Sequence, residues 1–252
     1  MKKARRVGLA RALSKLGYCS RSRAVELIRA GRVQLNGETQ RDPEAPVSLP
    51  RDRITVDAQT IGAATKIYRM FNKPRGVVTT ASDEKGRETV YAHVSEELPW
   101  LAPVGRLDKA SEGLLLLTND SEWAARITSP ESHLDKTYHV QIAALPDEAL
   151  LEKIKKGIRA QDGDLLRAKS AEILRRGEKN SWLIVVLDEG KNRQIRRIFE
   201  ALGIEVLRLV RVAIGPLALG DLPKGKSRPL TPAEKRILDA AMARSSSIRP
   251  QI

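Results

Sequence analysis

The sequence predicts an α+β protein, and three observations support this fold class. Segments with the two-residue apolar alternation of strands are mixed with helical segments at uneven spacing, unlike the regular order of βαβ units. The first part of the chain has a helix–helix–hairpin order, while the remainder is richer in strands. The chain of 252 residues, 41% of them hydrophobic, is long enough to bury a core and suits one large domain or two modest ones.

The N-terminal segment is expected to form two helices followed by a small sheet. Gly17 is placed to end the first helix in a left-handed conformation, and Ser20 is a good N-cap for the second. Asn36-Gly37 suits a type I′ hairpin turn between the first two strands. The expected helices cover residues 9–16 and 20–30, and the expected strands cover residues 32–35, 38–40 and 53–56.

The rest of the chain is expected to form a second domain of mixed strands and helices. The run Leu114–Leu117 predicts a buried strand, and the strict alternation of KTYHVQI predicts another over 136–142. Further strands are expected at 67–71, 77–80, 168–174, 182–187 and 206–214, and helices at 123–128, 147–156, 192–202 and 231–242. The predicted domains are therefore 1–61 and 67–243, with a linker at 62–66 and a flexible tail at 244–252.

The charge of the chain favours a polyanionic partner. Its formal net charge is +14, from 45 Lys+Arg against 31 Asp+Glu, and its pI is about 10.1. Neutralising phosphates and releasing their counterions is what such an excess does well. Residues 1–35 alone hold ten basic residues and one acid, Glu26. The sequence has no apolar run of 18 residues and no signal-like segment, so we expect no membrane span and no secretion. Cys19 is the single cysteine, which fits a cytoplasmic protein.

One stretch, VGRLDKASEGLLLLTND at 104–120, carries the strongest indication of chemistry. Asp108 follows Gly105-Arg106-Leu107 and precedes the apolar run at 114–117. A surface turn before a buried strand would explain the segment taken alone. However, the stretch resembles the catalytic motif of the RsuA/RluB-type pseudouridine synthases, in which the aspartate is the residue that carries out the chemistry.

Four further segments strengthen this resemblance. NKPRGVVTT at 72–80, KTYHV at 136–140 and EGKNRQIRRIFEALG at 189–203 resemble the same family in the same order. Residues 7–57 resemble the RNA-binding domain first known from small-subunit ribosomal protein S-four. The resemblance covers nearly the whole chain to about residue 242. It implies a mixed, mainly antiparallel sheet with a cleft along it, and an enzyme that isomerises uridine to pseudouridine in ribosomal RNA.

The residue types suit this reaction. Isomerisation breaks the bond from ribose to nitrogen 1 of uracil and joins carbon 5 to the sugar, so atoms are neither gained nor lost and we expect no cofactor and no metal. A carboxylate can attack the sugar carbon or remove the sugar 2′ proton to give a glycal, and the sequence leaves both routes open. Either route requires Asp108 to be ionised in a partly desolvated cleft, so a cation must lie beside it.

The resemblance assigns two partners to Asp108. It implies that Arg196 pairs with the aspartate, because a guanidinium holds a carboxylate in a fixed fork and stays charged. The alternative is that Arg196 is a phosphate-binding or surface arginine, roles that the neighbouring Arg193 and Arg197 could also fill. Tyr138 matches the aromatic residue that stacks on the target base, although a core tyrosine in a strand is the alternative.

The remaining basic residues are candidate RNA contacts. Arg106 could occupy the space left by the flipped base, hold a phosphate or form a structural ion pair. Phosphate binding is expected of Lys73, Arg75, Arg193 and Arg197, and of the N-terminal Arg11, Arg21, Arg23, Arg29 and Arg32. We assign packing roles to His133, His139 and Cys19, because no partner for catalysis accompanies them in the sequence.

The sequence therefore predicts a pseudouridine synthase that modifies ribosomal RNA, acts as a monomer and needs no cofactor. The wording of the motif around Asp108 and the long C-terminal part look closer to RluB-like enzymes of the large subunit than to RsuA-like enzymes of the small subunit. A non-catalytic RNA-binding assembly factor is the alternative from another class. A glycoside hydrolase normally needs a second carboxylate in register, and a DNA-binding regulator would need a reading helix. The target nucleotide, and whether the substrate is free RNA or an assembling subunit, stay open.

Overall fold

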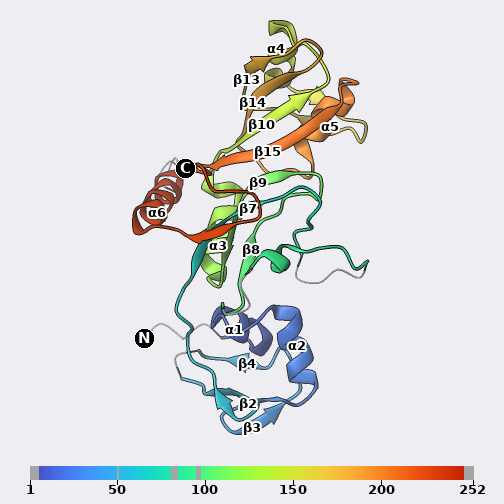
Figure 1. The fold of residues 1–252 in the computed structure, drawn as a ribbon. Coiled ribbons are helices and arrows are strands. Elements are labelled where there is room, and N and C mark those ends of the chain that lie inside the picture. The colour runs from blue at the N-terminus through green and yellow to red at the C-terminus, as the bar shows by residue number, and fades with distance from the viewer. Residues whose placement is uncertain (1–5, 50, 81–84, 95–97, 247–252) are drawn as a thin grey trace, which may run out of the picture. The chain divides into compact units, whose positions relative to one another are not determined.

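The computed structural model describes residues 6–49, 51–80, 85–94 and 98–246 (Figure 1). The chain divides into two compact units, each assembled from separate stretches of sequence. The first comprises Met1–Tyr68, Ser95–Val104 and Leu117–Ala125, and the second comprises Arg69–Val94, Gly105–Leu116 and Arg126–Ile252. Among the described helices, none is long and apolar enough to cross a membrane.

The first unit contains the expected helix–helix–hairpin order. Ser20 caps the second helix, since its Oγ accepts a hydrogen bond from the backbone N–H of Arg23. Asn36 and Gly37 both have positive φ, as a type I′ turn requires. The helices are α1 (Leu9–Lys15) and α2 (Arg21–Arg29), and the sheet order β3-β2-β5-β6 joins Glu38–Gln40, Val33–Leu35, Ile54–Val56 and Gln59–Thr60. A separate pair joins β1 (Val7–Gly8) to β4 (Pro46–Val47).

The first unit also takes in a segment beyond residue 61. Asn119 accepts a hydrogen bond from the backbone N–H of Ile67 and donates one to the carbonyl of Thr65. Tyr68 donates to Asp120 at 2.8 Å, and its ring meets the ring of Trp123 edge to face. These contacts fix residues 65–68, of which 65 and 66 were expected to belong to a linker and 67 and 68 to begin the second domain. The unit further contains β8 (Ala102–Val104) and most of α3 (Ser121–Thr128).

A mixed sheet of mainly antiparallel strands dominates the rest of the fold, as the sequence predicts. Its order is β13-β14-β10-β15-β9-β7-β17, with β16 (Leu217–Ala218) paired to β15 (Figure 1). The strands in that order are Ser170–Arg176, Ser181–Leu187, Lys136–Ile142, Val206–Ile214, Glu112–Thr118, Tyr68–Lys73 and Ser227–Pro229. A hairpin of β11 (Ile158–Arg159) and β12 (Leu165–Leu166) lies outside this sheet.

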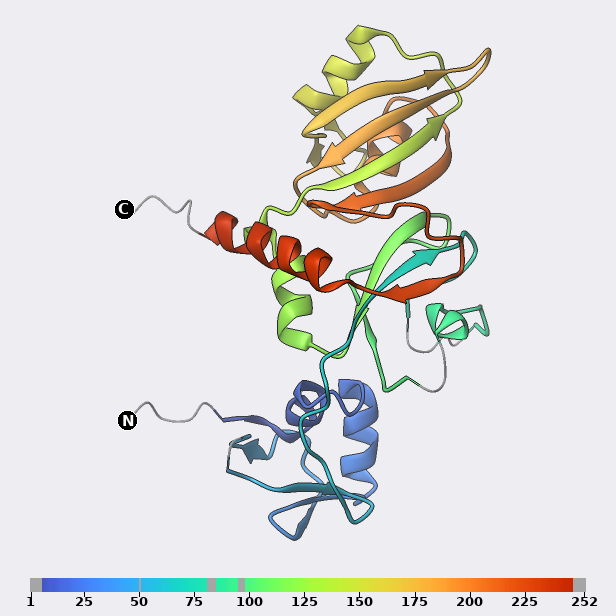
Figure 2. The ribbon, with the colours of Figure 1, turned by 60° about the vertical axis from the view of Figure 1, so that its left-hand side comes forward.

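Two helices cover one face of the four strands β13, β14, β10 and β15. Leu151 and Ile154 of α4 (Glu148–Lys156) and Ile198 and Phe199 of α5 (Gln194–Ala201) are buried there against Val140 and the alternate residues of the strands. Figure 2 shows this sheet with its other face toward the viewer and α5 behind it. The residues between the core positions, such as His139, therefore lie on a face that these helices leave open.

The two parts of the sheet meet where β15 pairs with β9. This parallel contact is short, with Val210 opposite Glu112 and Arg211 opposite Gly113. Gly113 has φ +101°, and a Cβ atom at this position would lie 2.2 Å from the carbonyl oxygen of Arg211. Only glycine allows the two backbones to approach this closely. Gly113 therefore allows β9, the strand after Asp108, to pair closely with β15, the strand that bears Arg208 and Arg211.

Most of the predicted elements are confirmed, with two exceptions. The strand expected at 77–80 is wrong, because Val78 forms only an isolated bridge to Thr89 beside a short 3₁₀ helix, Val90–His93. The second exception is the tail expected from 244, because residues 244–246 are helical. The C-terminal α6 (Pro232–Ser246) starts with the predicted capping box between Thr231 and Glu234 and continues through 244–246, and residues 247–252 lie outside the described part.

Candidate active site

Asp108 lies on the loop that leads into β9. Leu107 before it is buried, while the Asp108 side chain keeps 34% of its surface exposed. The loop closes on itself through a hydrogen bond from the N–H of Ser111 to the carbonyl of Asp108 at 2.9 Å. A hydrogen-bonded loop that carries a partly exposed carboxylate suits a reacting group, because the loop is fixed while the acid stays accessible.

The buried ammonium group of Lys73 binds the backbone of this loop. Lys73, at the end of β7, is completely buried, and its Nζ donates to the carbonyls of Pro74, Asp108 and Ser111 at 3.0, 3.1 and 2.8 Å. Burial lowers the pKa of Lys73 to about 8, although the nearby Asp108 and Glu112 act to raise it. The expectation that Lys73 binds an RNA phosphate does not fit this burial, because its donors are turned to the backbone of the Asp108 loop.

Two residues from the turn after β7 support the same loop. The N–H of Gly76 donates to the carbonyl of Lys109 at 2.8 Å. Thr79 Oγ1 donates to the carbonyl of Leu107 at 2.8 Å and lies 3.3 Å from the N–H of the same residue. Sequence analysis did not single out Thr79. The resemblance of NKPRGVVTT to the family motif was the signal that could have identified it.

The cation that pairs with Asp108 is Arg193. Its Nη1 lies 3.5 Å from Asp108 Oδ2, and this is the ion pair that Asp108 makes among the described residues. The expected ion pair with Arg196 is not formed. Arg196 instead donates through Nη2 to the carbonyl of Ala110 at 2.9 Å, so it binds the backbone of the loop rather than the carboxylate.

Arg196 nevertheless belongs to the same cluster. Burial lowers its pKa, the neighbouring Arg193 and Arg75 lower it further, and Asp108 acts to raise it. Its buried Nε has no hydrogen-bond partner among the described residues. Asp108 therefore has Lys73, Arg193 and Arg196 close by, and Arg75 lies near Arg196; of these four, Arg75 and Arg193 are exposed. This excess of positive charge around the site can attract a polyanion.

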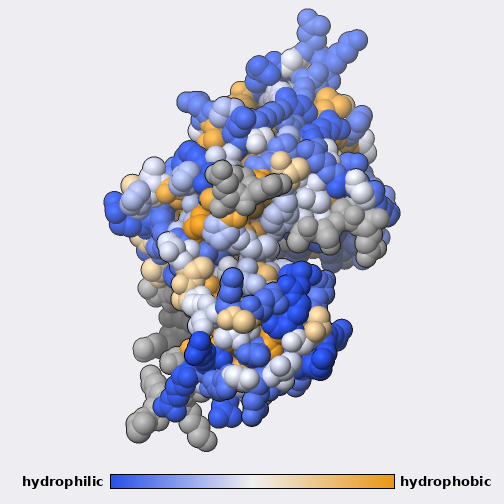
Figure 3. All heavy atoms as spheres, turned by 60° about the horizontal axis from the view of Figure 1, so that its bottom comes forward, coloured by the Kyte–Doolittle hydropathy of each residue, from blue (hydrophilic) through white to orange (hydrophobic). Residues whose placement is uncertain are grey.

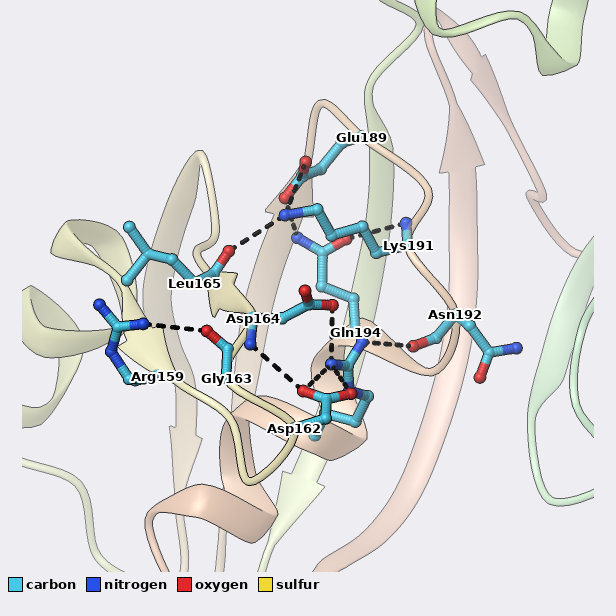
Figure 4. Close-up of polar contacts among 10 residues, drawn as sticks. Arg159, Asp162, Gly163, Asp164, Leu165, Glu189, Lys191, Asn192 and Gln194 are labelled. Carbon is cyan, nitrogen blue, oxygen red and sulfur yellow. Dashed lines mark hydrogen bonds and ion pairs between the residues drawn. The ribbon is translucent and has the colours of Figure 1, made fainter.

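The position of Arg193 depends on the buried amide of Gln194. Gln194 Nε2 donates to Glu189 Oε1 at 2.6 Å, and its Oε1 accepts from the N–H of Lys191 (Figure 4). Its Nε2 also donates to the carbonyl of Arg167 at 2.9 Å. Arg193 itself precedes α5 in a left-handed conformation, with φ 50°. These bonds fix the turn that directs Arg193 toward Asp108, a role that sequence analysis did not assign to Gln194.

Arg197 faces a different set of partners. Its Nη2 contacts both carboxylates of the β11–β12 hairpin, Asp162 and, at 2.9 Å, Asp164. Figure 4 shows these two acids together beside the turn that carries Asn192 and Gln194. The expectation that Arg197 binds RNA does not fit this arrangement, because its charge is already matched by two carboxylates. Arg197 ties the hairpin to α5.

Tyr138 lies in the middle of β10, on the face covered by α4 and α5, where it is partly buried against the core. It stands opposite Arg211 of β15, which in turn stands opposite Gly113 of β9. Arg211 is buried, donates through Nε to the carbonyl of Leu114 at 2.7 Å, and has an unpartnered Nη2 among the described residues. The sheet thus connects Tyr138 to the strand after Asp108 through an arginine that sequence analysis did not select.

Glu112 is a second carboxylate near Asp108, but it is not available for catalysis. It is buried and accepts two hydrogen bonds from Arg208, each at 3.1 Å, and one from Lys224. Burial alone would raise the pKa of Glu112, but the two cations outweigh it and lower this pKa. Glu112 therefore links β9 to β15 and to the loop at residue 224, and Asp108 remains the accessible acid.

The other candidate RNA contacts are exposed. Arg106 has a side chain without a polar partner in the described part of the chain. In the first unit, Arg23 pairs with Glu26 and Arg32 with Asp57, whereas Arg11, Arg21 and Arg29 have side chains free of ion pairs with the described residues. Figure 3 shows strongly hydrophilic side chains gathered on this unit.

The described residues contain no cluster of His, Cys, Asp and Glu side chains that could hold a metal ion. Cys19 is buried in the core of the first unit, and burial raises the pKa of its thiol to about 11. His139 lies on the open face of the sheet, apart from Asp108, and burial lowers its pKa.

We predict that replacing Lys73 by methionine destabilises the protein. At neutral pH the three carbonyls lose their common donor, and we expect the free energy of unfolding to fall by about 1–3 kcal/mol. The difference should widen above pH 8. Between about 8 and 10.5 the unfolded lysine keeps its proton while the folded one has released it, so the wild type gains stability as pH rises through this window.

The measurement is denaturant unfolding between pH 6 and 10, with the exposed Lys109→Met as the charge-matched control. Lys109→Met should follow the wild-type curve. A Lys73→Met variant as stable as the wild type at every pH would contradict the assigned role of the buried ammonium.

Comparison with known proteins agrees with the geometry of this site. Residues 67–201 match the family model described as RNA pseudouridylate synthase, and residues 7–54 match that of the S4 domain. The chain is 37% identical to ribosomal large subunit pseudouridine synthase B of Bacillus subtilis, over 92% of this chain and 95% of the relative. It is 38% identical to an uncharacterized RNA pseudouridine synthase of Rickettsia prowazekii, over 88% of this chain and 94% of the relative.

A solved structure shows the same relationship. The crystal structure of a pseudouridylate synthase, 31% identical in sequence, superposes with a TM-score of 0.66 over 92% of this chain and 99% of its own. The family model covers more than half of the chain, and the relatives extend over nearly all of it. The chain therefore belongs to the RNA pseudouridylate synthase family and is an enzyme that isomerises uridine in RNA to pseudouridine.

Proposed function

We propose that this enzyme modifies a uridine of large-subunit ribosomal RNA, with Asp108 as the catalytic residue. The relative in Bacillus subtilis bears the name of a large-subunit enzyme and aligns over nearly the full length of both chains. The single observation that carries the assignment of Asp108 is its position, half exposed on a clamped loop within a cluster of cations.

Asp108 acts on the ribose of a uridine that has left its stack. Its carboxylate either attacks the sugar carbon bonded to nitrogen 1 or removes the 2′ proton, and the bond from that carbon to nitrogen 1 breaks. The released uracil turns so that carbon 5 faces the sugar and bonds to it. On the first route this new bond displaces the Asp108 carboxylate from the sugar carbon, and on the second Asp108 returns the proton to the 2′ carbon. The proton on carbon 5 is then lost and nitrogen 1 gains one, which leaves the composition of the nucleotide unchanged.

The two arginines of the cluster take different parts. Arg193 supplies the positive charge beside the carboxylate, and its exposure lets it also meet the phosphate of the target nucleotide. Arg196 positions the loop by binding the Ala110 carbonyl and adds to the positive potential at Asp108. Tyr138 stacks on the base, and Arg75 and Arg106 bind the backbone of the RNA.

The S4 domain docks the enzyme on the RNA without taking part in the chemistry. Its exposed Arg11, Arg21 and Arg29 are free to bind phosphates, which position a protein without reading sequence. We place the enzyme in the cytoplasm, as a monomer that acts on ribosomal RNA either free or within an assembling subunit.

We predict that Asp108→Asn abolishes isomerisation and leaves RNA binding largely intact. The amide cannot serve as nucleophile or base, whereas the binding charge is spread over other residues. Pseudouridines are mapped in ribosomal RNA from cells that lack this gene and carry either the wild-type or the Asp108→Asn copy.

One large-subunit site should be restored by the wild-type copy alone. Restoration of a small-subunit site would move the substrate to the other ribosomal RNA, and restoration by both copies would exclude Asp108. Ribosome assembly defects without any lost pseudouridine would favour the assembly factor.

We predict that Arg193→Gln and Arg196→Gln have different effects. Loss of the Arg193 charge should lower kcat by about tenfold, equivalent to about 1.4 kcal/mol of transition-state stabilisation, with little change in stability because the ion pair is exposed. Arg196→Gln should lower both kcat and the free energy of unfolding, because the Ala110 carbonyl loses its donor.

Single-turnover kinetics and denaturant unfolding test this pair, with Arg193→Lys as the variant that retains the charge. If Arg196→Gln alone stops turnover at unchanged stability, Arg196 is the cation that faces Asp108 during the reaction.

We predict that the triple variant Arg11→Ala, Arg21→Ala and Arg29→Ala binds RNA more weakly and with a flatter dependence on salt. Three lost phosphate contacts should reduce the log–log salt slope by about 2–3. The measurement is a salt titration of affinity, with Arg32→Ala as the control because Arg32 is already paired with Asp57. An unchanged slope in the triple variant would remove these residues from the RNA interface.

A further inference from the structure

The open face of the sheet carries a row of side chains that the active site does not use. Arg175 of β13 stands opposite Trp182 of β14, Trp182 opposite Gln141 of β10, and Gln141 opposite Arg208 of β15. The four residues thus cross four adjacent strands, with an arginine at each end. Their position between the core residues of the same strands puts them on the face away from α4 and α5.

A groove of about 390 Å³ lies at the Arg175–Trp182 end of this row, lined by Trp182, Arg175, Leu174 and His139. A register shift between Ile173 and Arg175 brings two consecutive residues, Leu174 and Arg175, to the groove. Leu174 is 45% exposed, which is unusual for a leucine in a strand and leaves an apolar surface beside the indole ring. The volume is within the range of pockets that hold small planar ligands.

The Trp182 ring, at the centre of the row, has polar neighbours that are themselves fixed by hydrogen bonds. The guanidinium of Arg208 lies over Trp182, 5.4 Å from the ring centroid. Arg208 is itself fixed by its two hydrogen bonds to Glu112. Gln141 is likewise fixed, since its Nε2 donates to Asn180 Oδ1 at 3.1 Å. The indole is therefore a preorganised surface and not a freely rotating side chain.

The charge around the groove favours a polyanion. Arg175 and its neighbour Arg176 are exposed and make no ion pair within the described residues. Arg208 and Lys224 both pair with the single carboxylate of Glu112, which leaves one positive charge in excess there. One exposed acid, Glu172, lies on the same edge strand; the pKa of Lys155 is raised mainly by its hydrogen bond to Glu152 and to a smaller extent by Glu172. Neutral His139 completes the floor of the groove without adding charge at neutral pH.

We propose that this groove binds an unpaired nucleobase of the RNA substrate, stacked on Trp182, with Arg175 and Arg208 contacting the adjoining phosphates. Open antiparallel sheets with exposed aromatic residues are suited to this task, because every base has a π-face and the strands present rings and basic side chains side by side. The site is separate from Asp108, since His139 and Tyr138 are consecutive residues on opposite faces of β10.

The groove therefore gives the enzyme a second point of attachment to single-stranded RNA that flanks the target. This inference rests on RNA being the substrate, and it is independent of which uridine is modified. It also assigns a role to Trp182, Arg175 and Leu174, none of which the site around Asp108 requires.

The first experiment locates the contact. Oligouridylate of about ten nucleotides containing 5-bromouridine is irradiated with the full-length protein, and crosslinked peptides are identified by mass spectrometry. Crosslinks to the peptide with Trp182 are expected beside those to the peptide with Tyr138. Crosslinks confined to Tyr138 would overturn the proposal while leaving the proposed active site intact.

The second experiment measures the affinity for the same RNA. Trp182→Leu should weaken binding by about tenfold, whereas Trp182→Phe, which keeps a ring, should stay within about twofold. Equal losses in both variants, or a Trp182→Leu variant that binds like the wild type, would overturn the stacking role. Circular dichroism and thermal unfolding establish that each variant is folded.

Arg175→Ala provides a test that does not depend on the indole. It should reduce the log–log salt slope by about 0.7, the value for one contact with single-stranded RNA. The matched control is Lys156→Ala, which removes one exposed charge from α4 on the covered face. Equal slopes for both variants would overturn the proposal. So would a set of variants that bind RNA normally and lose activity on ribosomal particles alone, because the occupant would then be a protein.

Discussion

The arrangement of the active site depends on one buried ammonium group. Lys73 reaches from the end of β7 to three carbonyls, two of which belong to the loop that carries Asp108. These hydrogen bonds satisfy the backbone carbonyls of the loop. The Asp108 carboxylate therefore does not have to accept structural hydrogen bonds itself. Burying a charge is unfavourable, and the pKa of Lys73, lowered to about 8, reflects that penalty. The fold thus accepts a local cost in stability to keep the acid rigid and accessible.

Much of the fold could be predicted from periodicity and local signals. The helices at 9–15 and 21–29 and the Asn36-Gly37 turn carry local start or stop signals, the strand at 136–142 carries a strict alternation, and the structure confirms all four. The strand expected at 77–80 fails because VVTT has strand propensity but no partner strand alongside it, and Thr79 is used to bind Leu107. Tertiary context overrode a local preference there. The short strands such as β16 and β17 are two or three residues long, and a period cannot be read from so few positions.

The site was predictable only in part, for a related reason. Asp108 could be found because the motif around it is distinctive. The roles of the nearby arginines could not be inferred from the sequence NRQIRR, because successive side chains at the start of a helix point in different directions. Arg193 meets Asp108, Arg196 meets the Ala110 carbonyl, and Arg197 turns to Asp162 and Asp164. Lys73 looked like a phosphate ligand because its burial depends on contacts 35 and 38 residues away along the chain.

The backbone of Arg193 sets a limit on how this protein can be improved. Its left-handed conformation is one that glycine and asparagine adopt at least cost, while an arginine there carries roughly 1–2 kcal/mol of strain. Selection for thermal tolerance alone would therefore favour replacing Arg193. The same replacement removes the guanidinium that lies 3.5 Å from Asp108. At this position, selection for stability and selection for activity favour different residues. Variant libraries of this protein selected for heat resistance should therefore lose Arg193, whereas libraries selected for turnover should keep it.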